Sequence, residues 1–399
     1  MAAGVVWGQE ASPTTPKPSK EISALIASAR KLAPKDRPAA GEKILARAKQ
    51  IHDLPGEASV LLFLGNAYMR LEDYQRALVF DKQALAAWQS AKDPIGAPEV
   101  WYGIGNDYYN LKRYKQALPC YQQALALWNK WDYRRAQAEA VASIGDTYYC
   151  LGQPQKGINF CNQRAAAAQK RGDRYGQAAA LGDVGFLYQD LKQGQNSIKY
   201  FNQAQAIFKA LGEANAECVI LDPMAAEYFD LGQEPKALAF LEREVDLLKK
   251  LGRGHDEATT MVRIAYILNK DSQYEDALAY YLQALALYRA CNDPAMESDS
   301  LDGAAFEYQC LLQDKDAVNS GAEAFNLAEQ IGDKRREANA LSQMGESYYQ
   351  LKQKSNALKC LRRALALYRD VKDSTDAALA QQWIDWVSRP WWQKILNGD

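Results

Sequence analysis

Histidine and cysteine, the side chains that most often hold metals or act as nucleophiles, are few and scattered in this chain. Two histidines, His52 and His255, stand far apart, and none of the seven cysteines forms a CxxC pair. A structural zinc site needs such ligands at short, regular spacings, so the sequence argues against one. The glycines around Gly103 and Gly105 are not followed by a phosphate-binding turn. We therefore expect no catalytic residue, no metal and no cofactor.

Binding chemistry is better represented, because amides, aromatic rings and aspartates recur at matching positions. Asn66 and Asn106 are 40 residues apart, as are Tyr109 and Tyr149. Amides can pair with the backbone of an extended peptide, aromatic rings can hold its side chains, and aspartates favour basic groups. Packing between neighbouring helices is an equal alternative for several of the aromatic rings. The candidate binding residues are Asn66, Tyr102, Asn106, Tyr109, Asp146, Tyr149, Phe186, Asp190, Phe229, Asp230 and Arg263.

These positions recur because almost the whole chain has a period of 40 residues. A small residue marks each repeat, and tyrosine follows it three positions later in every repeat except the sixth, which has Leu268. A fixed period of this length is typical of a solenoid built from one repeated unit. The small residues, taken as position zero of each repeat, are Gly65, Gly105, Gly145, Gly185, Ala225, Ala265, Ala305 and Gly345.

The residues around position zero predict two helices in each repeat. Apolar side chains at −4 and −1, with tyrosine at +3 and leucine at +6 in most repeats, form the stripe of a first helix, helix A. A small residue at +12 and an aliphatic one at +13 belong to a second helix, helix B. Small residues let two backbones approach closely, so we expect the helices to cross at zero and +12. If helix A lines a groove, positions −3, −2, +1, +4 and +5 face it, and the candidate binding residues occupy these positions.

The helix ends carry their own signals. Glycines such as Gly172 and Gly332 suit helix C-termini, where a left-handed residue is favoured. Aspartates follow in the connecting turns, where they can cap the next helix. These aspartates are Asp93, Asp173, Asp293, Asp333 and Asp373.

One proline interrupts the pattern. Pro223 falls two residues before position zero of the fifth repeat, inside the predicted helix A. Proline there removes a backbone hydrogen bond and clashes with the preceding turn. We therefore expect a kink or a late helix start, with Asp222 as the cap of the restarted helix.

The repeated pattern resembles the tetratricopeptide repeat. The residues that carry the resemblance read LGNAYMRLEDYQRALVFDKQAL and IGNDYYNLKRYKQALPCYQQAL, and the match covers about residues 55–372. The common form has 34 residues, and the longer form resembles that of Pins-like adaptors, kinesin light chains and bacterial peptide-responsive regulators. The resemblance implies an all-α fold, a right-handed superhelical α-solenoid of stacked helix-turn-helix repeats. It also implies that helix A lines a concave groove for peptides or proteins.

A more specific feature of some relatives is not matched. Asn66 and Asn106 stand where chaperone-binding relatives place an asparagine that holds a peptide backbone or carboxylate. Those relatives also carry a lysine at position −3, where this chain has Leu62 and Tyr102. The comparison therefore argues against a clamp for a C-terminal carboxylate.

The period divides the chain into four predicted parts. Residues 1–20 form a disordered leader or the remnant of a targeting segment, and residues 21–54 form N-terminal capping helices. Residues 55–372 form eight repeats, and residues 373–399 form a C-terminal capping helix with a tryptophan-rich tail. A cap for the last repeat is one role for this tail; contact with a partner through Trp391 and Trp392 is the alternative.

We interpret the chain as a non-enzymatic interaction scaffold or adaptor that binds a peptide or protein segment in its groove. The alternatives are a peptide-sensing bacterial regulator and an assembly factor that docks partners on its convex face. A net charge of −1 does not favour nucleic acid, and no apolar run approaches the length of a membrane span. The expected partner is a protein or peptide with basic groups; the oligomeric state is left open. We expect a cytoplasmic location, or export if the true start lies upstream of Met1.

Overall fold

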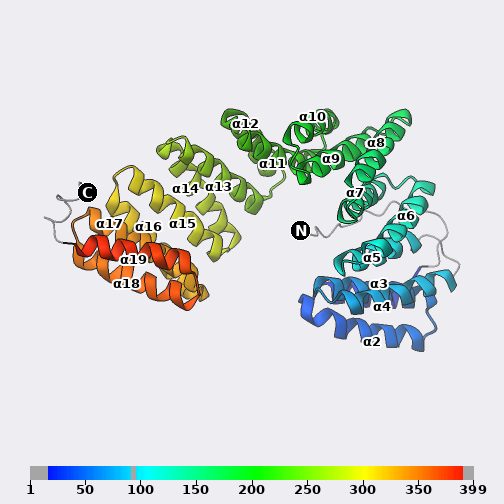
Figure 1. Ribbon diagram of the computed structural model, residues 1–399. Coiled ribbons are helices and arrows are strands. Elements are labelled where there is room, and N and C mark those ends of the chain that lie inside the picture. Colours follow the sequence, from blue (N-terminus) through cyan, green and yellow to red (C-terminus); the bar gives the residue numbers. More distant parts are fainter. Residues whose placement is uncertain (1–16, 91–95, 390–399) are drawn as a thin grey trace. The chain divides into compact units, whose positions relative to one another are not determined.

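All regular structure in the described part of the chain is helical. The computed structural model describes residues 17–90 and 96–389, and these contain 19 α-helices, one short 3-10 helix (Pro34–Asp36) and no strand (Figure 1). The all-α solenoid of stacked helix pairs is thereby confirmed. The chain divides into two compact units, Met1–Leu211 and Gly212–Asp399.

The described residues of the first unit form ten α-helices that follow one another along the chain. Its helices are α1 (Lys20–Arg30), α2 (Arg37–Gln50), α3 (Leu54–Arg70), α4 (Tyr74–Ser90), α5 (Ala97–Asn110), α6 (Tyr114–Lys130), α7 (Arg134–Cys150), α8 (Pro154–Lys170), α9 (Arg174–Asp190) and α10 (Gly194–Leu211).

The second unit continues the same alternation. Its helices are α11 (Ala214–Asp230), α12 (Glu234–Lys250), α13 (Gly254–Lys270), α14 (Tyr274–Cys291), α15 (Pro294–Cys310), α16 (Asp314–Ile331), α17 (Lys334–Gln350), α18 (Lys354–Asp370) and α19 (Ser374–Ser388). From α3 onward, the odd-numbered helices through α17 are the predicted A helices and the even-numbered ones through α18 are the B helices.

The two helices of a repeat cross where the sequence places its smallest residues. A side chain on Gly157, at position +12 of the third repeat, would lie only 2.9 Å from the backbone oxygen of Gly145 at position zero. The corresponding alanines Ala77 and Ala117 are fully buried. Such close backbone contact requires small residues, so the predicted crossing point is confirmed.

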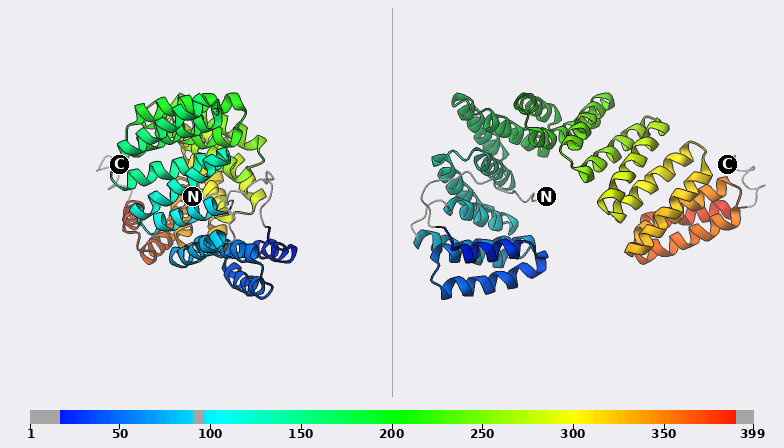
Figure 2. Two further views of the ribbon diagram at one scale, coloured as in Figure 1. Left: turned by 90° about the vertical axis from the view of Figure 1, so that its right-hand side faces the viewer. Right: turned by 180° about the vertical axis from the view of Figure 1, so that it is seen from behind.

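The A helices of each unit form one continuous layer. Successive A helices contact each other directly in some pairs, as α3 does α5 and α7 does α9 in the first unit, and as α15 does α17 in the second. Side-chain contacts join α5 to α7, α11 to α13 and α13 to α15. Every B helix packs against the A helix of its own repeat, and within each unit every B helix but the last also packs against the A helix of the next repeat. Figure 2 shows these layers from two further sides. Side chains on the exposed face of the A layer are therefore the ones that neighbouring repeats bring together.

Helix ends follow the predicted chemistry. Gly172 and Gly332 both adopt a φ of +71°, the left-handed conformation that glycine tolerates at a helix end. Four of the five predicted aspartates accept a hydrogen bond from a backbone N–H of the helix that follows; Asp93 lies outside the described residues. The capping residues are Asp173, Asp293, Asp333 and Asp373.

The expectation of a late helix start at Pro223 is wrong. Helix α11 begins at Ala214 and continues through the proline to Asp230. Asp222 does not cap a helix but forms an ion pair with Arg263 of α13. Packing by neighbouring repeats thus maintains a helix that proline alone would interrupt.

Helix α19 packs against the last repeat and contacts it through two tryptophan side chains. Trp383 and Trp386 are partly buried against the hydrophobic cluster of α17, α18 and α19, with their rings 5.4 Å apart. The Trp386 ring also lies 4.6 Å from that of Tyr349. Trp391 and Trp392, proposed for partner contact, lie outside the described residues.

Candidate functional site

The described candidate binding residues all lie on A helices. Eight belong to the first unit, on α3, α5, α7 and α9, and three to the second, on α11 and α13. Their contacts within the protein indicate which of them already take part in packing.

Three candidate tyrosines connect successive A helices. The hydroxyl of Tyr102 lies 3.1 Å from the Ser143 hydroxyl, and that of Tyr109 lies 3.3 Å from the Cys150 thiol. Tyr149 donates a hydrogen bond of 3.2 Å to the backbone oxygen of Asp190. Each contact joins residues 41 positions apart, one repeat and one residue. These tyrosines therefore hold the A layer together, whatever else they bind.

Two further candidates contact the B helix of their own repeat. Tyr121 donates a 2.9 Å hydrogen bond to Oδ1 of Asn106, and Phe186 packs edge-on against Phe201 with ring centroids 5.0 Å apart. Asn66, in contrast, is exposed on α3. Packing thus accounts for part of the predicted set, as the alternative interpretation of the aromatic positions anticipated.

Four carboxylates of α7 and α9 form what we call the acidic patch: Glu139, Asp146, Asp183 and Asp190. None of them forms an ion pair with a lysine or arginine in the described part of the chain, and Oδ2 of Asp183 is buried without a hydrogen-bond partner. Two of them, Asp146 and Asp190, were predicted from the sequence; Glu139 and Asp183 complete the group.

The acidic patch carries raised pKa values. Burial raises the pKa of Glu139 to about 7. Burial, with a smaller effect from Asp190, raises the pKa of Asp146 to about 6, although its side chain still reaches solvent. Burial and then the charge of Asp146 raise the pKa of Asp183. Repulsion between carboxylates therefore adds to burial for Asp146 and Asp183, and no lysine or arginine among the described residues forms an ion pair that would offset it.

An aromatic hydroxyl lies among these charges. Burial raises the pKa of Tyr102 to about 12, and the charges of Glu139, Asp146 and Asp183 add to the increase. The patch therefore combines carboxylates with an aromatic residue that a neighbouring repeat has positioned.

Of the candidate binding residues in the second unit, two are held by contacts within the protein and one is exposed. Arg263 is held by its ion pair with Asp222. Phe229 contacts Tyr266, with ring centroids 6.2 Å apart, and Lys270 places its ammonium 4.6 Å from the Phe229 ring centre. Asp230 is exposed at the end of α11. The predicted residues of this unit do not form one cluster.

The second unit instead has an open hollow, which we call the α15 hollow. Its lining residues were not among the candidate binding residues predicted from the sequence. It has a volume of about 450 Å³. Its lining comes from α13, α14, α15 and α17: Tyr266, Asn269, Tyr281, Asp299, Asp302, Gly303, Phe306, Glu307 and Gln343. Tyr266 and Phe306 occupy position +1 of consecutive repeats, a groove position, and this spacing was the signal that could have identified the hollow.

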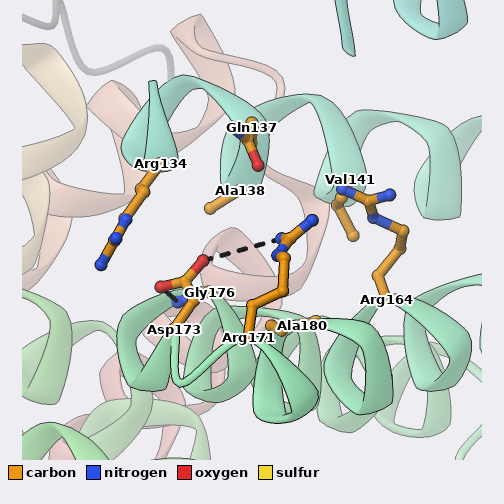
Figure 3. Close-up of a pocket in the computed structure, with 10 residues that line it drawn as sticks. Arg134, Gln137, Ala138, Val141, Arg164, Arg171, Asp173, Gly176 and Ala180 are labelled. Carbon is orange, nitrogen blue, oxygen red and sulfur yellow. Dashed lines mark hydrogen bonds and ion pairs between the residues drawn. The ribbon is translucent and has the colours of Figure 1, made fainter. Parts of the chain in front are cut away.

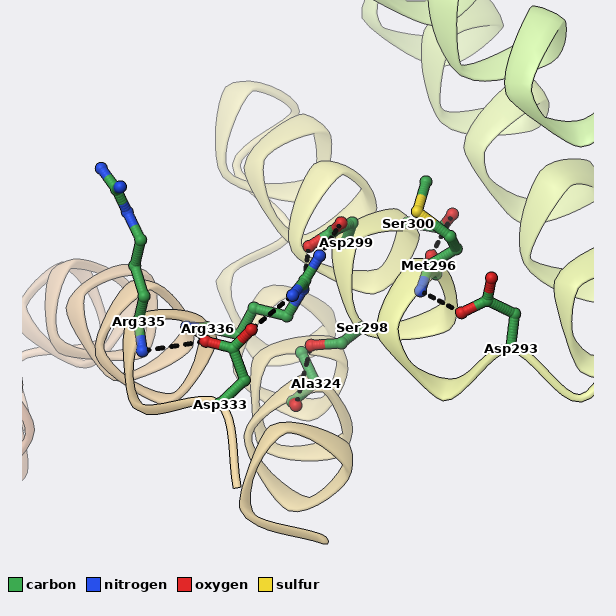
Figure 4. A network of polar contacts seen from close by, with 9 residues as sticks. All are labelled: Asp293, Met296, Ser298, Asp299, Ser300, Ala324, Asp333, Arg335 and Arg336. Atoms are coloured by element: carbon green, nitrogen blue, oxygen red, sulfur yellow. Dashed lines mark hydrogen bonds and ion pairs between the residues drawn. The ribbon is translucent and has the colours of Figure 1, made fainter. Parts of the chain in front are cut away.

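Polar contacts order the rim of this hollow. Asn269 donates to both carboxylate oxygens of Glu307, at 2.9 and 3.0 Å. Arg336 of α17 binds both oxygens of Asp299, at 2.7 and 2.8 Å (Figure 4). Arg336 also pairs with Asp333, the cap of its own helix. One acidic group of the rim is therefore neutralised from within the chain.

A second, smaller hollow lies between α7, α8 and α9 (Figure 3). Arg134, Arg164 and Arg171 line it, and Arg171 lies 4.0 Å from the Asp173 carboxylate. Its volume of about 20 Å³ is room for a single water molecule. It is too small to take a peptide side chain.

The described part of the chain has no candidate metal site and no candidate membrane span. No group of three or more histidine, cysteine, aspartate or glutamate side chains there could hold a metal ion. None of the helices in residues 17–90 and 96–389 has the length and apolar character that crossing a membrane requires.

Sequence comparison identifies the repeats. Tetratricopeptide repeat models match residues 97–170 and 217–290, residues 338–371, and residues 58–91, which together make up more than half of the chain. No curated protein gives a significant sequence match.

Several solved structures are similar to this chain. One is the signal transduction ATPase PH0952 from Pyrococcus horikoshii, which has a tetratricopeptide repeat sensor: 17% identity, TM-score 0.54, covering 86% of this chain and half of that one. Another is BtubC from P. vanneervenii: 16% identity, TM-score 0.45, covering 55% and 92%. RapI, in its apo form, has 13% identity and a TM-score of 0.49, covering 89% and 99%.

Proposed function

The chain belongs to the tetratricopeptide repeat family, and from this premise we propose that it is a non-enzymatic scaffold that binds a basic peptide or protein segment along its A helices. The acidic patch of α7 and α9 is the observation that carries the proposal. It places four carboxylates on the layer of A helices, beside Tyr102, and none of them forms an ion pair with a lysine or arginine among the described residues.

A positively charged ligand would lower the electrostatic free-energy cost of ionising these carboxylates. Burial makes each carboxylate of the patch harder to ionise than in water, and a neighbouring carboxylate adds to this effect for Asp146 and Asp183. An ammonium or guanidinium group placed among them favours their ionised forms and gains electrostatic free energy in return. The free protein is therefore prepared for a basic partner and repels an acidic one.

The test replaces the two solvent-accessible carboxylates of the patch. The full chain and its Asp146→Asn/Asp190→Asn variant are titrated into a fluorescein-labelled peptide of alternating lysine and alanine, and binding is followed by fluorescence anisotropy. We expect the double variant to bind about tenfold or more weakly, because each contact between ligand and carboxylate contributes on the order of 1 kcal/mol at a half-exposed site.

Asp132→Asn is the matched control, because it removes the same charge from an exposed turn of the first unit, outside the patch and outside the candidate binding residues. It should leave the affinity nearly unchanged, and a peptide of alternating glutamate and alanine should not bind. Equal weakening by Asp132→Asn would mean that only the overall charge matters, and unchanged binding by the double variant would refute the proposal. Pull-down from the native lysate with both variants then identifies the natural partner.

A further inference from the structure

We propose that the α15 hollow binds one arginine side chain of the partner segment. The inference rests on the proposed function, because it assigns a side chain to the ligand that the scaffold holds. It concerns the second unit, whereas the acidic patch belongs to the first, so the two sites can be tested separately.

The wall of the hollow is aromatic and open. Tyr266 is 53% and Phe306 45% exposed, and they are among the most exposed large apolar side chains of the described chain. Such rings attract cations to their faces. The chain itself provides an example, because the ammonium of Lys270 lies 5.4 Å from the centre of the Tyr266 ring.

The floor of the hollow is opened by a missing side chain. Gly303 of α15 lies directly over the ring of Tyr281, and a Cβ atom at this position would overlap that ring. Burial raises the pKa of Tyr281 to about 12. The charges of Glu307 and Asp302 add to the increase, so both carboxylates act on the Tyr281 hydroxyl. The floor is thus an aromatic surface with negative charge beside it.

Two carboxyl groups of the hollow form no ion pair with any lysine or arginine that the structure describes. Arg336 neutralises Asp299, whereas Glu307 is held only by the neutral amide of Asn269. Asp302 receives a neutral amide as well: Gln343, in the orientation that satisfies its neighbours, donates to the Asp302 backbone oxygen at 3.0 Å and to Oδ1 at 3.2 Å. Oriented but unneutralised carboxyls next to exposed rings complement a cationic group.

Arginine meets these requirements better than the other side chains. Its guanidinium is flat, stacks on aromatic faces and donates several hydrogen bonds in one plane, so a single group can contact the rings and a carboxylate together. Lysine offers a point charge without the flat surface. An apolar side chain could fill the space between the rings but would leave the carboxyls unpaired.

Fluorine NMR of the full chain labelled with 4-fluorophenylalanine can test this assignment directly. The chain has ten phenylalanines, and the resonance of Phe306 is assigned by its loss in Phe306→Leu. The probes are four acetylated glycine-serine nonapeptides whose central residue is arginine, citrulline, lysine or norleucine. We expect the arginine peptide to shift the Phe306 resonance most strongly, and citrulline, which has the same shape without the charge, to shift it little.

Three variants connect the shift to the proposed contacts. Asp302→Asn should lower the affinity for the arginine peptide about tenfold, as removal of one partner of a charge pair does. Lys270→Met should raise the affinity for the arginine peptide about two- to threefold, because the substitution removes the ammonium group that competes for the Tyr266 ring. The control Glu275→Gln removes a charge from the exposed start of α14 and should change nothing. A gain of affinity in Lys270→Met cannot be explained by loss of folding.

The result decides between the sites. The inference is refuted if the Phe306 resonance does not respond to the arginine peptide, or if citrulline or norleucine shifts it equally. In that case binding of the lysine-alanine peptide that depends on Asp146 and Asp190 would still support the proposed function. Loss of that dependence, with the arginine response of Phe306 retained, would instead refute the role of the acidic patch alone.

Discussion

At the scale of single residues, Asp81 and Asp107 form a buried pair of carboxyl groups without a cationic neighbour in the described chain. Asp107 is fully buried and neither of its oxygens has a hydrogen-bond partner. Asp81 lies at position +16 of its repeat, where Tyr121 and Phe201 stand in later repeats. It fits only because Gly65 and Gly103 have no side chain, since a Cβ at either would overlap its carboxyl group.

This pair predicts that acid stabilises the first unit. Burial raises the pKa of Asp107 to about 8, whereas an unfolded aspartate titrates near pH ~4. Between these values the folded state keeps a proton that the unfolded state loses, so the free energy of unfolding falls as pH rises. Removing this proton site in Asp107→Asn should make the slope less negative by about 1.4 kcal/mol per pH unit between roughly pH 5 and pH 7.

Urea unfolding followed by circular dichroism at several pH values measures this slope. The exposed Asp132→Asn, also in the first unit, is the control and should keep the wild-type slope. Parallel curves for wild type and Asp107→Asn would show that Asp107 is ionised in the folded state, which would contradict a raised pKa for this carboxyl group.

At the scale of helices, the contact between position zero of helix A and position +16 of helix B sets which side chains each repeat can accept. A Cβ on Gly185 would lie 2.5 Å from the ring of Phe201, whereas one on Gly145 would lie 3.1 Å from the Cys161 sulfur. In the fifth repeat, alanine at position zero (Ala225) is combined with Leu241 at +16, which is smaller than the phenylalanine of the fourth repeat. The two positions are therefore coupled by shape.

Gly185→Ala should destabilise the protein by roughly 1–3 kcal/mol through overpacking, although alanine favours a helix by about 1 kcal/mol over glycine. Adding Phe201→Leu, which reproduces the fifth repeat, should recover most of the loss. Gly145→Ala is the matched control and should be close to neutral, because the sulfur can move by a few tenths of an ångström. A double-mutant cycle from urea unfolding measures the coupling; equal stability of the two alanine variants would contradict it.

The same distinction explains what the sequence could reveal about the site. Positions zero and +12 are buried in all eight repeats, so a single period is sufficient to predict the helix pairs and their crossing. Groove positions depend on the neighbouring repeat instead: Tyr109 contacts Cys150, 41 residues later, and the group met at this spacing differs from repeat to repeat. The α15 hollow depends on Gly303, whose effect is visible only once Tyr281 lies beneath it.

At the scale of the whole molecule, the hydrophobic core is a series of clusters and not one centre. One cluster joins α1 to α4, another joins α3 to α6, and a third joins α17 to α19. Each consists of consecutive helices within one unit, so stability should be a sum of local terms between neighbouring repeats. Both proposed binding sites should share this property, because each is built by neighbouring repeats of one unit.

A cavity at one end of the chain should therefore remain a local defect. Leu361 of α18 is fully buried in the cluster of α17 to α19, and Leu361→Ala should cost about 2–5 kcal/mol. Hydrogen exchange followed by mass spectrometry should show faster exchange in α17, α18 and α19, with α3 to α6 unchanged, and the lysine-alanine peptide should still bind the acidic patch with wild-type affinity. Leu379→Ala, which removes a half-exposed leucine of α19, should change exchange little. Faster exchange throughout both units would show that the chain unfolds as one cooperative body, and the independence of the two sites would then be lost.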